Sequence, residues 1–153
     1  MGQVNELTVR SIGRVMAMAG GAEREAQIEI EEAWAEALDG IEEFSHIWVL
    51  WWFDRSEAPD SPRVHPEGRP EMPLVGIFAT RSPRRPNPLA LTAVRLVKRQ
   101  GNRLHVQGLE AHDGTPVLDL KTYLGRGDRI PEATMSAWVE RLWRLHDEER
   151  EES

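Results

Sequence analysis

The stretch GIFATRSPRRPNPLAL, from Gly76 to Leu91, sets the expected organisation of the chain. Apolar residues from Leu74 to Thr80 predict a strand, which Pro83, Pro86 and Pro88 then break into a loop. Each proline fixes its own φ and favours extended geometry in the residue before it, so the loop is expected to be stiff. A stiff, arginine-rich loop loses little entropy on closing around an anion, which favours a carboxylate or phosphate site.

The three arginines of this loop have different expected roles. Arg81 directly follows the predicted strand, so its backbone is anchored and its guanidinium is matched to a carboxylate or phosphate. Arg84 and Arg85 lie further along the loop and are expected to extend outward. Ion pairs with acids of the same chain are the alternative for all three residues.

Alternating and continuous apolar runs on both sides of the loop predict further strands. The expected strands cover residues 7–18 with a bend at Gly13, and residues 27–30, 47–53, 89–99, 103–109 and 116–124. Gly101-Asn102 suits the tight turn of a hairpin. Residues 33–38 predict a short helix, and residues 55–72 contain four prolines and predict a long irregular connection.

After the last strand the apolar spacing changes to three and four residues, which predicts an amphipathic helix over residues 131–150. The expected fold is all-β, a barrel-like closed sheet capped by this one C-terminal helix. At 153 residues the chain has the length of a single domain, with its core expected over residues 7–124.

The net charge is 19 − 26 = −7, which disfavours a nucleic-acid partner. The charges are unevenly distributed: residues 21–45 carry nine acids and one base, and residues 63–103 carry nine bases and two acids. The region around the central loop is therefore expected to form a basic surface, and another face to be acidic. The alternative is that the two segments neutralise each other within the fold.

Several classes of site find no support in the sequence. There are no cysteines, no Gly-rich dinucleotide or P-loop motif, and no histidine pair at metal-binding spacing, so we expect no metal. The longest apolar run, Ile47 to Phe53, is too short to cross a bilayer, and no signal peptide is evident. We therefore expect no membrane association and a cytoplasmic protein.

Three ordered blocks together resemble one known family: FSHIWVLWWF from Phe44, GIFATRSPRRPNP from Gly76 and GLEAHDGTPVLDLKTYL from Gly108. They are similar to the TsaA-like (YaeB-like or TrmO-like) family of S-adenosylmethionine-dependent tRNA methyltransferases, over about residues 11–124. The resemblance implies a barrel-like fold, S-adenosylmethionine as cofactor, tRNA as partner and a homodimer. Full-length members carry a further C-terminal domain, which is not expected in the residues after Leu124.

The resemblance also suggests site residues. The implied cofactor contacts are Arg81, Leu91, Gln107, Gly108, Leu109, Glu110, Asp54 and Arg55. Independently of the family, free backbone groups at the end of the strand before Glu110 suit the edge of an adenine. The expected substrate contacts are Arg84, Arg85, Asn87, Lys121 and Tyr123.

Methyl transfer to an exocyclic amine needs in-line placement and a proton acceptor, but no nucleophilic side chain. Asp113 and Asp119 are the candidate catalytic carboxylates, although Asp113 also suits a turn and Asp119 an ion pair with Lys121. The expected activity is methylation of the exocyclic amine of a modified adenosine beside the tRNA anticodon. The alternatives are a module that binds S-adenosylmethionine or a small anion without methylating RNA, and an interaction protein that dimerises through Trp48, Trp51 and Trp52.

Overall fold

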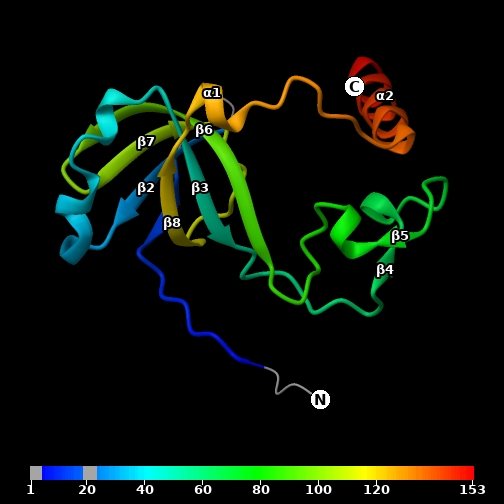
Figure 1. Ribbon diagram of the computed structural model, residues 1–153, viewed down its shortest axis with the longest axis horizontal. Coiled ribbons are helices and arrows are strands. Elements are labelled where there is room, and N and C mark those ends of the chain that lie inside the picture. Colours follow the sequence, from blue (N-terminus) through cyan, green and yellow to red (C-terminus); the bar gives the residue numbers. More distant parts are fainter. Residues whose placement is uncertain (1–4, 19–23) are drawn as a thin grey trace.

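The computed structural model describes residues 5–18 and 24–153, and its centre is a closed antiparallel barrel (Figure 1). The strand order around the barrel is β1, β2, β7, β6, β3, β8, with β8 returning to β1. The strands are β1 (Gly13–Ala17), β2 (Glu25–Ile30), β3 (His46–Trp52), β6 (Leu89–Gln100), β7 (Arg103–Gln107) and β8 (Pro116–Thr122). The predicted all-β closed sheet is confirmed.

The barrel core comes from strict alternation along the strands. Ile47, Val49 and Trp51 of β3 are buried, while Trp48 faces outward and is only half-buried. Because successive strand residues point to opposite faces, an apolar run such as this one supplies both a core and an outer apolar surface. The indole N–H of Trp51 donates to the hydroxyl of Thr92 inside the barrel at 3.0 Å.

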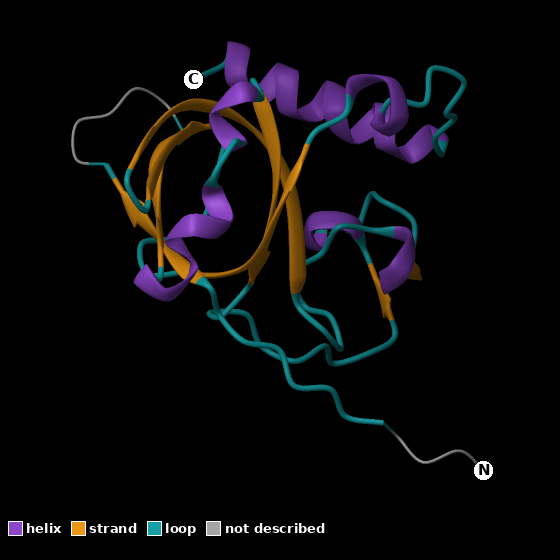
Figure 2. Cartoon of the chain, turned by 60° about the vertical axis from the view of Figure 1, so that its left-hand side comes forward, coloured by secondary structure: helices purple, strands orange, loops and turns teal. Residues whose placement is uncertain are grey.

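The two ends of the barrel carry different segments. The 3-10 helices η1 (Glu32–Leu38) and η2 (Ile41–Glu43) lie across the end where β2 finishes and β3 begins (Figure 2). The opposite end is formed by the last residues of β1, β3 and β7 and the first residues of β2, β6 and β8. Each antiparallel strand therefore places its first and last residues at opposite ends.

A second unit stands beside the barrel and carries the proline loop. The strands β4 (Arg63–Val64) and β5 (Val75–Gly76) form a two-stranded ribbon, with η3 (Pro66–Gly68) and η4 (Ile77–Ala79) next to them. The C-terminal helix α2 (Ala137–Glu151) lies over this ribbon (Figure 1). The sequence led us to expect that this helix caps the barrel. It lies over the ribbon instead.

Side chains of α2 and of the ribbon connection hold these two elements together. Arg69 pairs with Glu149 at 2.9 Å and with Glu67 at 3.3 Å, and His146 Nε2 lies 2.8 Å from the Glu67 carboxylate. Burial alone would raise the pKa of Glu67, but the His146 and Arg69 contacts outweigh it and hold that pKa below its ordinary value. Leu142 of α2 is buried.

Several elements differ from the sequence prediction, and the larger differences concern four segments. Residues 7–12 precede β1 and leave Leu7 exposed, because among the described residues only Ile12 of this segment bonds to a neighbouring strand, through its N–H to the Val117 carbonyl. Residues 74–80 form only the short β5 and then η4, while residues 55–72 contain β4 and are not wholly irregular. The helix begins at Ala137, not Pro131, and a short α1 (Gly125–Asp128) precedes it.

Candidate functional site

The loop before β8 forms hydrogen bonds to β1 and to the segment after β3, at the barrel end opposite η1. The Asp113 carboxylate accepts the backbone N–H of Ala17 at 3.0 Å, and Gly114 donates to the Val15 carbonyl at 2.7 Å. Arg55, which follows β3, donates from Nη2 to the Asp113 carbonyl at 3.3 Å. The expected turn at Asp113 is present, and it brings together two sequence-predicted site residues from distant segments.

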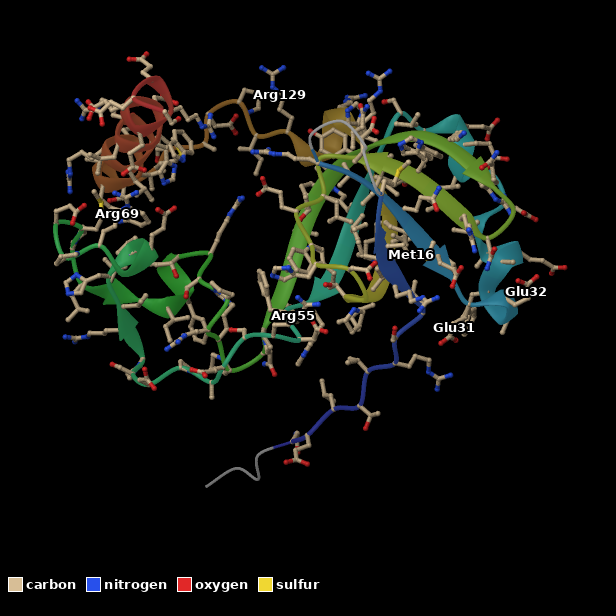
Figure 3. All side chains as sticks on the ribbon, turned by 180° about the vertical axis from the view of Figure 1, so that it is seen from behind. Met16, Glu31, Glu32, Arg55, Arg69 and Arg129 are labelled. Atoms are coloured by element: carbon tan, nitrogen blue, oxygen red, sulfur yellow. The ribbon has the colours of Figure 1, made fainter. Side chains whose placement is uncertain are left out.

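A cavity of about 510 Å³ opens beside this turn. Its walls are Arg14, Val15, Met16, Ala17, Met18, Gln27, Asp113 and Gly114. Figure 3 labels Met16 and Arg55 on this part of the barrel. Met16 and Met18 were not predicted from the sequence, because an apolar thioether side chain at a strand end gives no chemical signal of its own.

The segment from Gln107 to Glu110 leaves β7 at the same barrel end. The Gln107 amide donates to Glu25 at 2.9 Å, and the Glu110 carboxylate pairs with Arg24 at 2.8 Å. The N–H of Gly108 donates to the Arg24 carbonyl at 3.0 Å, so the expectation of a free backbone group is wrong at this residue. In the described part of the chain, the N–H groups of Leu109 and Glu110 make no hydrogen bond.

Leu91 lies on the outer face of β6, directly opposite Leu50 of β3, and is 58% exposed. The segment after β7 lies beside the same strand two residues further on, since a Cβ on Gly108 would lie 3.9 Å from the Ala93 carbonyl. The candidate contacts Leu91 and Gln107 to Glu110 therefore occupy adjoining strands. Asp54 lies after β3 beside Arg55, where its N–H donates to the Trp52 carbonyl at 2.9 Å.

The proline loop holds its three arginines in three different states. Arg81 is exposed and makes no hydrogen bond or ion pair within the described residues. Arg84 pairs with Glu57 at 3.2 Å and Asp60 at 3.3 Å. The internal ion pair weighed for all three arginines is thus seen at Arg84 and not at Arg81.

Arg85 does not extend outward, which corrects its expected role as an RNA contact. Its Nη1 donates to the carbonyls of Thr80 at 2.9 Å, Ser82 at 3.2 Å and Ile77 at 3.4 Å, and its guanidinium lies 5.9 Å from the centre of the Phe78 ring. A planar donor group that satisfies several carbonyls at once stabilises a loop that has no regular backbone pairing.

We predict that Arg85→Ala disorders the loop that presents Arg81. The partly buried carbonyls of Thr80 and Ser82 lose their Arg85 donor, at a cost of about 1–3 kcal/mol of local stability. Hydrogen exchange should become faster for residues 77–87 and stay unchanged for the barrel strands. Arg84→Ala is the matched control, since its ion pairs are exposed and are expected to contribute little. Unchanged exchange in Arg85→Ala would show that the prolines alone hold the loop.

Asp119 and Lys121 lie near the η1 end of the barrel, away from Arg55 and Asp113. Their charged groups form an exposed pair at 3.2 Å, so the structural alternative considered for Asp119 is present. Tyr123 follows them and packs against Trp48, with ring centres 5.5 Å apart. The structure therefore separates the expected site residues into two groups on the barrel, with Asn87 and the arginines on the loop as a third.

The basic segment from Arg63 to Arg103 does not form one free cationic surface. Four of its nine bases are ion-paired, namely Arg69, Arg84, Arg99 and Arg103. Asp39 and Glu42 of the acidic segment pair with Arg99, and Glu29 pairs with Arg103. The two segments thus neutralise each other in part.

Among the described residues no group of three or more His, Cys, Asp or Glu side chains is arranged to hold a metal ion. Of the described helices, none has the length and apolar character needed to span a membrane.

Fold and site together define a class: a small antiparallel barrel with a strand-end cavity and a separate arginine loop. The family model for the tRNA-methyltransferase O N-terminal domain matches residues 16–129, and this chain belongs to that family. The match includes the turn at Asp113 and the loop at Arg81, which the sequence analysis had identified by resemblance.

Individual relatives support this assignment. A "Probable S-adenosyl-L-methionine-binding protein" of Pyrococcus horikoshii is 43% identical over 109 residues, which cover 69% of this chain and 78% of the relative. An S-adenosyl-L-methionine-binding protein of Archaeoglobus fulgidus is 44% identical over 98 residues, covering 64% and 68%. The crystal structure of TrmO from Pseudomonas aeruginosa matches with a TM-score of 0.68 and 27% identity, covering 87% of this chain and 63% of the TrmO chain.

Proposed function

We propose that this protein binds S-adenosylmethionine and transfers its methyl group to the exocyclic amine of a modified adenosine beside the anticodon of a tRNA. The observation that carries the proposal is the family match over residues 16–129, which includes an exposed arginine without a partner in the described chain. The relatives named as S-adenosylmethionine-binding proteins agree with this cofactor. An enzyme acting on tRNA would work in the cytoplasm, the location that we propose.

The residues present fit such a cofactor. The free N–H groups of Leu109 and Glu110 suit an adenine edge, and Met16 and Met18 in the wall of the cavity beside Asp113 offer contacts to an apolar portion of a ligand. Arg81 offers an unpaired guanidinium for the amino-acid carboxylate. When bound, the cofactor supplies an electrophilic methyl group, and the protein need only orient the acceptor amine and exclude water.

Asp113 is the better placed of the two candidate proton acceptors. It lies beside Arg55 and the cavity, and one of its carboxylate oxygens accepts the Ala17 N–H, which fixes its orientation. Asp119 lies toward the other end of β8 and is paired with Lys121. We therefore assign the transient acceptance of the amine proton to Asp113.

A binding module that holds S-adenosylmethionine without methylating RNA is the second candidate. The observation that favours it is that two of the relatives are described as S-adenosyl-L-methionine-binding proteins. Calorimetric titration with S-adenosylmethionine, followed by a radiolabelled methyl-transfer assay on bulk tRNA, separates the two. Binding with label in RNA supports the enzyme, and binding without label supports the module.

We also propose a homodimer. Leu50 and Trp52 of β3 and Leu89 and Leu91 of β6 form an outward-facing apolar patch, with Leu89 47% and Leu91 58% exposed. Trp51 does not belong to this surface, contrary to the sequence prediction, because it is buried in the barrel. Since Arg81 contacts none of the barrel candidates within one chain, a site shared between two copies would also give this arginine a partner.

Light scattering at micromolar concentration should give about twice the chain mass of 17.4 kDa. Leu89→Lys places a charge in the patch and should halve the measured mass, because an unpaired charge in an apolar interface is costly. Val97→Lys is the matched control, since Val97 is 43% exposed near the other end of the same strand. A wild-type monomer mass would exclude the dimer.

A further inference from the structure

A surface away from the cavity combines aromatic rings with unpaired cations. It consists of His46 and Trp48 from β3, Arg95 from β6, Lys121 from β8, Tyr123 directly after β8, and Arg126 and Arg129 around α1. We refer to these seven residues as the outer platform. They come from three stretches that are distant in sequence, residues 46–48, residue 95 and residues 121–129, which strand pairing and the Trp48–Asp128 hydrogen bond place side by side.

Strand register explains the juxtaposition. Trp48 is flanked by Lys121 on β8 and by Ala93 on β6, and His46 faces Arg95 across the same ladder. Cross-strand neighbours on one face have Cβ atoms about 5 Å apart, so their side chains share one surface. The N–H of Tyr123 donates to the His46 carbonyl at 3.2 Å and so extends this alignment beyond β8.

The rings of the platform are held in place before any ligand arrives. Tyr123 lies 5.5 Å from Trp48 and 6.3 Å from His46 between ring centres. The Trp48 indole N–H donates to Asp128 at 2.8 Å, and Asp128 also accepts the Leu124 N–H at 2.9 Å. The hydrogen bond from Leu124, and to a smaller extent the one from Trp48, hold the pKa of Asp128 below its ordinary value. The Asp128 carboxylate that holds Trp48 therefore stays ionised at neutral pH.

The charge on this surface is mainly cationic. Arg95, Arg126 and Arg129 are exposed and have no ion pair within the described residues, and Figure 3 shows Arg129 extending from the segment after α1. Asp119 is paired with Lys121, and Asp128 is held by Leu124 and Trp48. Glu43 of η2 lines a cavity together with Lys121, which already has Asp119 as its partner. Arg95, Arg126 and Arg129 are therefore the groups of this surface that are free to bind an anion.

We propose that the outer platform binds RNA, with unpaired bases against the aromatic rings and phosphates on Arg95, Arg126 and Arg129. Ordered aromatic faces combined with free guanidinium groups are the arrangement that single-stranded nucleic acid requires. A second copy of the chain is a poorer occupant, because a two-fold contact here would bring like charges together. The proposal rests on the proposed function in that it identifies where the RNA substrate is held.

The platform and the cavity beside Asp113 then contact different parts of one RNA. The seven residues of β3 separate His46 from Trp52 by about 20 Å at about 3.3 Å per residue. That distance corresponds to about six stacked nucleotides at about 3.4 Å each. Contacts this far from the reacting base select the RNA without taking part in methyl transfer.

The test compares two platform variants with a matched control. Arg126→Gln combined with Arg129→Gln removes two phosphate contacts, and Tyr123→Leu removes a stacking ring but keeps apolar volume. Arg141→Gln combined with Arg144→Gln is the control, since both arginines are exposed on α2 and unpaired within the described residues. The probe is a fluorescein-labelled RNA stem-loop with an unpaired loop, followed by anisotropy over a range of salt concentrations.

We expect Tyr123→Leu to weaken RNA binding about 5- to 150-fold. The double arginine variant should flatten the slope of log affinity against log salt by about 1.4 units. S-adenosylmethionine affinity by calorimetry should be unchanged in both platform variants, and the control should match the wild type throughout.

Each other outcome has a distinct meaning. Equal RNA affinity in wild type and platform variants, with methyl transfer intact, overturns the platform and leaves the proposed function standing. Loss of RNA binding in the variants, with no methyl transfer by the wild type, supports the outer platform as an RNA site and contradicts the proposed methyltransferase activity. A wild type that binds no RNA overturns the platform, as does a change of mass rather than of RNA affinity in the variants.

Discussion

Replacing Arg81 with alanine is expected to weaken S-adenosylmethionine binding about ten- to a hundredfold. Loss of a charge-assisted hydrogen bond to a carboxylate costs about 1.5–3 kcal/mol, which corresponds to that change in affinity. The melting temperature should not change, because Arg81 is exposed and has no partner within the described residues. Arg81→Lys should fall in between, since an ammonium keeps the charge and loses the planar fork.

The measurement is calorimetric titration of purified wild type and variants with S-adenosylmethionine. Arg63→Ala is the matched control, because Arg63 belongs to the same ribbon and its exposed side chain also makes no described contact. Its affinity should equal that of the wild type. Equal affinity in Arg81→Ala would remove Arg81 from the cofactor site and leave the barrel cavity as the remaining candidate.

The closed barrel could be predicted from the sequence because its strands satisfy local rules. The run of residues 47–53 is apolar on both faces, and the turn at Gly101 has φ +61, the left-handed geometry expected of a tight hairpin. Residues 7–12 also contain regularly spaced apolar residues, Leu7, Val9 and Ile12, but lie outside β1. Pairing with a neighbour decides between strand and extended tail, and that neighbour cannot be read from the segment itself.

The position of α2 could not be predicted for a related reason. Its apolar spacing shows that one face is buried but does not say against what. The partners of α2 include Glu67 and Arg69, in a connection whose prolines suggested no regular structure. The short ribbon forms there because Arg63 pairs with Gly76, thirteen residues further along the chain.

The candidate site likewise divides into residues that could be predicted from the sequence and residues that could not. Arg81 and Asp113 could be proposed as site residues because a guanidinium group indicates anion binding and a carboxylate group indicates proton acceptance. The role of Arg85 could not, since a charged side chain that binds its own loop has the same sequence signature as one that binds a ligand. Met16 carries no charge and was found only through the cavity that it lines.

Barrel closure gives the second large prediction. Gly13 begins β1 and, like Arg14 after it, pairs with β2 on one side and with β8 on the other. A Cβ at this position would overlap the Glu29 carbonyl oxygen and lie 3.0 Å from both Cα and Cδ1 of Ile30. Since two of these atoms belong to the backbone of β2, rotation of a side chain cannot relieve the overlap.

Gly13→Ala is therefore expected to destabilise the protein by about 3 kcal/mol or more, because β1 must move away from a closed sheet. For a chain of this length such a loss lowers the melting temperature by roughly 6–12 °C, measured by circular dichroism. Gly76→Ala is the control: a Cβ there meets nothing within 4 Å, and its φ of −63° suits alanine. That variant should melt at the wild-type temperature or slightly above it, because alanine restricts the unfolded chain. Equal melting of both variants would mean that the barrel accommodates a side chain between β1 and β2.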